Sequence, residues 1–70
     1  MRYRDAARKL AELGCYEIPR RGRGSHRGWF NPRTQRDAVL PDWGGRDLKI
    51  GTLRSAIRQL GVDWNEFQER

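Results

Sequence analysis

Cysteine and histidine are scarce in this 70-residue chain, which has one of each, Cys15 and His26. A lone cysteine excludes an internal disulfide, and one cysteine with one histidine falls short of the ligand sets that hold structural zinc. We therefore expect no metal site and no cofactor. A chain without a disulfide framework also fits a reducing compartment, so a cytoplasmic protein is expected.

Long apolar runs are absent as well, since none approaches the roughly 20 residues that span a bilayer. The charged beginning "MRYRDAARKLAEL" does not resemble a signal peptide, and no membrane association is expected. A chain of this length is sufficient for one small domain, which we assign to residues 1–70. Its core must be small, so a functional site is expected on the surface.

Acidic residues are missing from Ile18 to Arg36, although the chain as a whole has nine. This window holds six of the 15 lysines and arginines, so the nine outside it balance the nine acids. The net charge of +6 therefore arises within one stretch. A basic stripe on a neutral body is typical of a phosphate-binding protein, and the alternative is a solvated loop. The six arginines are Arg20, Arg21, Arg23, Arg27, Arg33 and Arg36.

The pattern of apolar residues predicts the order α-β-β-β-α, followed by a short extra helix. Helical spacing occurs in "RYRDAARKLAELG", in "GTLRSAIRQLG" and in the closing "DWNEFQER". Three short stretches, "CYEIPRRG", "SHRGWF" and "DAVLP", have the character of strands, and "NPRTQR" predicts a hairpin loop between the last two. We expect an α+β fold in which a three-stranded antiparallel sheet carries the helices on one face.

His26 is the candidate for chemistry. An imidazole can move protons near neutral pH, and arginines can stabilise charge on a phosphate. RNA supplies its own nucleophile, the 2′-hydroxyl, so a histidine among arginines provides the minimal set of groups for a weak, metal-independent ribonuclease, and composition alone goes no further. Ser25 is not expected to be a nucleophile activated by His26, because adjacent residues on a strand point to opposite faces. A hydrogen-bonded loop histidine is the alternative.

Aromatic residues near His26 admit two interpretations. Trp29 and Phe30 are adjacent in a strand, so one should face the core and the other the solvent. An exposed ring could stack on a base. We expect Phe30 and Trp64 in the core, and leave Trp29 and Trp43 open between core and RNA contact.

The chain resembles the HicA toxins, small mRNA interferases of type II toxin–antitoxin systems with a double-stranded-RNA-binding-like α-β-β-β-α fold. The likeness covers nearly the whole chain. It rests on "KLAELG", "RGRGSHRGWFNP", "VLP" and "DLKIGTLRSAIRQLGVDWNEF". It is the combination of Gly-Ser-His with the later Gly-Thr-Leu-Arg and closing helices that makes the resemblance specific.

This resemblance implies an endoribonuclease that cleaves mRNA, with His26 as the catalytic residue and Gly24 and Ser25 as the motif that presents it. It also implies a HicB-like antitoxin that covers the His26 surface. Many family members have a second histidine after the third strand, where this chain has Trp43, so the second proton carrier is open: water, or His26 in both directions.

We expect Arg23 and Arg27 to contact the scissile phosphate, and Arg20, Arg21, Arg33 and Arg36 to bind flanking phosphates. Trp29 is a further candidate for RNA contact. Two alternatives to catalysis remain at this point. One is an RNA-binding module without activity on the same fold, and the other is a DNA-binding accessory protein.

Overall fold

The computed structural model describes residues 1–19 and 24–70, and its elements follow the predicted order. They are α1 (Tyr3–Glu12), β1 (Tyr16–Ile18), β2 (His26–Asn31), β3 (Arg36–Pro41), α2 (Ile50–Gln59) and α3 (Trp64–Gln68). The sheet order is β1-β2-β3, with both pairs antiparallel. The α-β-β-β-α prediction with a short extra helix is confirmed.

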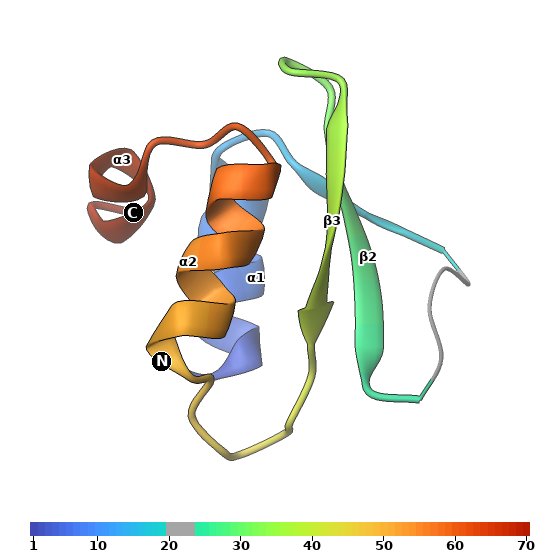
Figure 1. Ribbon diagram of the computed structural model, residues 1–70, viewed down its shortest axis with the longest axis vertical. Helices are drawn as coiled ribbons and strands as arrows, with labels where there is room; N and C mark the ends of the chain where they lie inside the picture. Colours follow the sequence, from blue (N-terminus) through green and yellow to red (C-terminus); the bar gives the residue numbers. More distant parts are fainter. Residues whose placement is uncertain (20–23) are drawn as a thin grey trace.

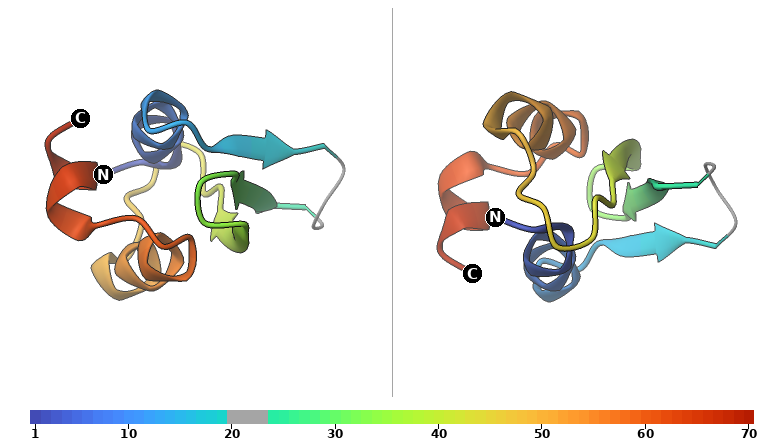
Figure 2. Two further views of the ribbon diagram at one scale, coloured as in Figure 1. Left: turned by 90° about the horizontal axis from the view of Figure 1, so that it is seen from above. Right: turned by 90° about the horizontal axis from the view of Figure 1, so that it is seen from below.

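The helices lie on one side of the sheet, as Figure 1 shows. Figure 2 shows α1 and α2 next to the strands, with α3 on the side of this helix pair that faces away from the sheet. Among the described residues, this arrangement leaves the second face of the sheet without a helix. The prediction that the helices share one face is therefore confirmed.

Both long helices end in the same way. Gly14 after α1 and Gly61 after α2 have positive φ angles of 92° and 72°, a conformation that glycine adopts without strain. The amide of the next residue then bonds back into the last turn: Cys15 to the Leu10 carbonyl, and Val62 to the Ile57 carbonyl. These glycines end the helices where the sequence pattern predicted.

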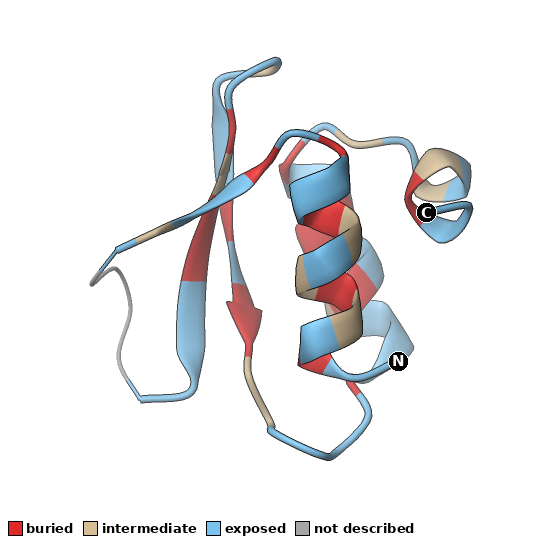
Figure 3. Ribbon diagram, turned by 180° about the vertical axis from the view of Figure 1, so that it is seen from behind, coloured by how far each residue is buried: buried red, intermediate tan, exposed pale blue. Residues whose placement is uncertain are grey.

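The core lies between the sheet and the helices, and Figure 3 shows buried residues on the strands and on the helices that pack against them. Its most deeply buried large side chains come from all three helices, from β3 and from the residue that follows α2: Leu10, Leu40, Leu53, Ile57, Leu60 and Phe67. The hairpin between β2 and β3 is fixed to this core by Asn31. Its Nδ2 donates to the Leu60 carbonyl over 2.9 Å, and its Oδ1 accepts the amide of Arg33.

Candidate functional site

His26 is the first residue of β2, the central strand, and its side chain is exposed. It pairs in register with Pro41 of β3. Gly24, at a φ of 56°, and Ser25 form the exposed turn before it. Within the part of the chain that the structure describes, no hydrogen bond or ion pair joins the imidazole to another residue.

The face of the sheet that carries His26 points away from the helices. Side chains alternate along a strand, and Trp29 packs toward α1, so His26 and Phe30 share the opposite face. Tyr16 on β1 pairs with Phe30, and their ring centroids are 5.6 Å apart. Tyr16 is 52% exposed. This aromatic pair was missed by the sequence reasoning, although the alternation in "CYEI" could have indicated it.

Trp29 does not provide the RNA contact considered for it. Its side chain is buried at 5% exposure, and Nε1 donates to the Tyr3 hydroxyl over 3.1 Å. Phe30, expected in the core, is instead half-buried on the outer face. The strand alternates as predicted, but it is Trp29 that faces the core and Phe30 that faces outward, the reverse of what was expected for Phe30. The stacking interpretation of Trp29 is therefore wrong.

Arg27 also lies differently from expectation. Because it follows His26 on a strand, its side chain belongs to the helix-facing side of the sheet, where it meets two carboxylates. Its guanidinium nitrogens are 3.7 Å from Glu17 Oε2 and 3.6 Å from Asp42 Oδ2. The guanidinium therefore lies on the opposite side of the sheet from the side chain of His26 and is already paired with carboxylates.

The other expected phosphate ligands divide into two groups. Arg33 and Arg36 are exposed at the hairpin end of the sheet, about 16 Å along β2 from His26 at roughly 3.3 Å per residue. They can meet only the flanking part of a ligand. Arg20, Arg21 and Arg23 lie outside the described residues.

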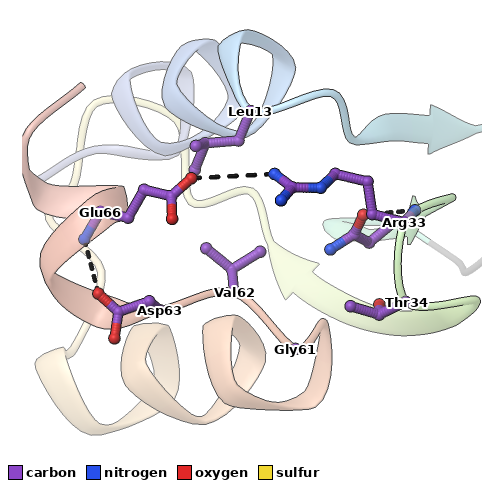
Figure 4. Close-up of a pocket in the computed structure, with 8 residues that line it drawn as sticks. Leu13, Arg33, Thr34, Gly61, Val62, Asp63 and Glu66 are labelled. Atoms are coloured by element: carbon purple, nitrogen blue, oxygen red, sulfur yellow. Dashed lines mark hydrogen bonds and ion pairs between the residues drawn. The ribbon is translucent and has the colours of Figure 1, made fainter.

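Arg33 borders a groove of about 250 Å³ between the hairpin, the end of α1 and α3 (Figure 4). Its guanidinium lies 3.9 Å from Glu66 Oε1, while the amide of Glu66 donates to Asp63 Oδ2. The groove is lined by Leu13, Asn31, Arg33, Thr34, Gly61, Val62, Asp63 and Glu66. It therefore contains charges of both signs, and His26 is not among its lining residues.

A second groove, of about 300 Å³, lies between α2 and α3. The guanidinium of Arg54 is centred 4.9 Å from the ring of Trp64, which is half-buried against the core as expected. Trp43, left open above, is also half-buried and packs against the core. Neither tryptophan presents a free ring beside His26.

Metal ligation finds no support in the described ranges 1–19 and 24–70, which contain no group of three or more histidine, cysteine or acidic side chains able to hold an ion. The described residues likewise include no helix long and apolar enough to cross a bilayer. Burial raises the pKa of the Cys15 thiol, which disfavours its thiolate form and removes it as a candidate nucleophile.

Comparison with protein families gives one decisive result. The model of the family described as HicA toxin of bacterial toxin–antitoxin systems matches residues 3–62, six-sevenths of the chain. This chain belongs to the HicA toxin family. Comparisons with curated proteins and with solved structures gave no match. As a HicA toxin it is the toxic component of a pair, and the family implies a cognate antitoxin as its partner. The matched range of this HicA protein includes His26 and all three strands, but not α3.

Proposed function

We propose that this HicA-family toxin is a metal-independent endoribonuclease that cleaves mRNA, with His26 as general acid and base. One observation carries the proposal: an exposed imidazole, without a partner among the described residues, stands at the start of the central strand. It directly follows the Gly24-Ser25 turn. The segment that precedes this turn contributes three of the six arginines that create the positive excess.

The proposed reaction needs one group that can take and return a proton. His26 Nδ1 or Nε2 accepts the proton of a 2′-hydroxyl while that oxygen forms a bond to the adjacent phosphorus. The bond from phosphorus to the 5′-oxygen breaks, and this oxygen receives a proton from the imidazolium or from water. The products are a cyclic phosphate and a free 5′-hydroxyl. Proton transfer of this kind contributes typically about 10²–10⁴-fold to a rate.

Binding of the RNA would rest on charge and stacking. Arg20, Arg21 and Arg23 are the proposed phosphate ligands nearest to His26 in the sequence, and Arg33 and Arg36 would meet flanking phosphates. Tyr16 and Phe30 replace Trp29 as the proposed stacking surface. They lie on the face of His26, about 13 Å along β2 at roughly 3.3 Å per residue.

The proposed antitoxin is HicB-like and covers the His26 face. Two properties of this face support the assignment. No described helix packs on it, and Val39, in register with Gly28 at its centre, is 49% exposed. An antitoxin seated there would bury the apolar side chains and exclude RNA from His26 at the same time. We also propose that toxin and antitoxin meet in the cytoplasm.

The decisive test compares the wild type with His26→Ala on a synthetic RNA in EDTA. A DNA–RNA chimera with a single 2′-deoxy position at the cleaved bond serves as a second substrate. We expect the wild type to cleave RNA but not the chimera, and His26→Ala to lose at least about 100-fold in rate while binding RNA as before. Arg58→Ala, on α2, is a control for a surface change. Undiminished cleavage by His26→Ala, or a strict need for a metal ion, would refute the proposal.

A module that binds RNA without cleaving it is the second candidate. The Tyr16–Phe30 pair on the outer face, of which Tyr16 is exposed, favours it, because stacking needs no proton carrier. This candidate predicts salt-sensitive binding by both the wild type and His26→Ala, with no product at any pH. Equal affinity for DNA of the same length would instead favour a DNA-binding accessory role, because DNA lacks the 2′-hydroxyl.

A further inference from the structure

Asp42 is connected to both chain neighbours of His26. It follows Pro41 at the end of β3, and its backbone amide donates to the carbonyl of Ser25, the residue before His26. Its carboxylate Oδ2 lies 3.6 Å from the guanidinium of Arg27, the residue after His26. Asp42 thus holds the backbone of Ser25, before His26, and the side chain of Arg27, after it.

The carboxylate of Asp42 is itself fixed. Its Oδ1 accepts the amide of Gly44 over 3.0 Å, which closes a short turn after β3. The side chain of Asp42 is 27% exposed, compared with 46% for Arg27, so the pair is partly shielded from solvent. An aspartate that is anchored by its own turn can serve as a fixed point for β2.

Arg27 extends this connection to β1, the remaining strand of the sheet. Its other guanidinium nitrogen lies 3.7 Å from Glu17 Oε2 on β1, and Glu17 Oε1 accepts the hydroxyl of Tyr3 over 3.0 Å. One guanidinium therefore links β1 to the end of β3 directly beneath the start of β2. Two carboxylates therefore already neutralise this guanidinium among the described residues, which weakens Arg27 as a ligand for a phosphate.

The backbone at His26 consequently determines where the imidazole stands, because no described residue holds the ring itself. We propose that Asp42 and Arg27 form a clasp that positions His26 for catalysis, and that Arg27 is a positioning residue instead of a ligand to the scissile phosphate. This inference rests on the proposed ribonuclease function. A displacement of about 1 Å at a reacting group can cost on the order of 10²-fold in rate.

The test uses Asp42→Asn and Arg27→Gln, singly and together, with Arg27→Lys as the conservative variant. Asp42→Asn keeps the backbone amide and Oδ1 but removes the charge. We expect each single variant to lower kcat about 10- to 100-fold with little change in KM. The double variant should lose no more than the worse single variant, because both act through one clasp. Arg27→Lys should recover part of kcat.

Salt dependence of RNA binding separates the two roles of Arg27. If Arg27 binds a phosphate, Arg27→Gln should reduce the slope of log K against log salt by about 0.7 for single-stranded RNA. The clasp predicts the same slope as in the wild type. Arg33→Gln, at a proposed phosphate ligand, is the matched control and should reduce the slope. A reduced slope in Arg27→Gln with unchanged kcat would overturn the inference.

Failure of the proposed ribonuclease function can be distinguished from failure of the clasp. If the wild type binds RNA but does not cleave it, the ribonuclease proposal fails, and with it the catalytic purpose of the clasp. Whether the clasp exists as a structural element is then tested by amide hydrogen exchange. The amides of Ser25 to Arg27 should exchange faster in Asp42→Asn than in the wild type. Unchanged exchange there would exclude the clasp whatever the activity.

Discussion

The indole Nε1 of Trp29 donates a hydrogen bond to the hydroxyl of Tyr3 over 3.1 Å, although 26 residues separate them in the sequence. The same hydroxyl donates to Glu17 Oε1 over 3.0 Å. Tyr3 therefore joins the first turn of α1 to two strands. This explains why Trp29, and not its neighbour Phe30, occupies the core, since a buried indole N–H requires an acceptor.

Removal of this hydroxyl should destabilise the fold. Tyr3→Phe leaves the N–H of Trp29 without its acceptor and Glu17 without its donor, so we expect the free energy of unfolding to fall by about 1–3 kcal/mol. Urea denaturation measures this difference. Tyr16→Phe is the matched control, because the side chain of Tyr16 is half-exposed on the other face, and it should change stability by less than about 0.5 kcal/mol. Equal effects in both variants would contradict the prediction.

Alkaline pH should weaken the fold through the same tyrosine. Burial raises the pKa of Tyr3 from 10.0 to about 12, and the hydrogen bond to Glu17 acts in the same direction. Above pH 10 the unfolded chain releases the Tyr3 proton more readily than the folded one, so stability is lost between about pH 10 and 12. Tyr3→Phe should lack this part of the loss. Parallel stability profiles of wild type and variant over this range would refute the assignment.

Gly61 should be less tolerant of a side chain than Gly14. Both end a helix with a positive φ, so alanine at either position costs about 1–2 kcal/mol in backbone strain. A Cβ at Gly61 would also lie 2.8 Å from Thr34 Cγ2, while one at Gly14 would meet nothing within 4 Å.

We therefore expect Gly61→Ala to reduce thermal stability more than Gly14→Ala does. Thr34→Ser removes Cγ2 but keeps the hydroxyl that donates to the Leu60 carbonyl. Combined with Gly61→Ala, it should recover part of the loss. Melting temperatures of the four variants and the wild type measure the effect, and an identical cost at both glycines would show that the steric contact is relieved without penalty.

Much of the fold could be predicted from local pattern. The helical spacing before Gly14 and Gly61 indicated both long helices, and alternation indicated the strands, because the period of each element follows from which side meets the core. The Gly-Ser-His motif placed His26 at the start of β2. These features depend on neighbours a few residues apart, and a single sequence contains that information.

Which residues of β2 face the core could not be predicted in the same way. Alternation indicates that Trp29 and Phe30 face opposite directions, but which of them is buried depends on partners distant in the sequence, such as the hydroxyl of Tyr3 that accepts the indole N–H. The surroundings of Arg27 could not be predicted for a similar reason. Its carboxylate partners, Glu17 and Asp42, come beside it only through the strand register.

The shortest helix, α3, has five residues, far fewer than the roughly 12–15 at which isolated helices become marginally stable. It persists because Phe67 is fully buried and because Lys9 on α1 donates to the Gln68 carbonyl over 3.0 Å. Its helical conformation therefore depends on these contacts with the rest of the domain. The first and last helices are consequently coupled, and because α3 does not persist undocked, its amides are expected to exchange whenever it separates from α1, at a lower free energy than the opening of the whole domain.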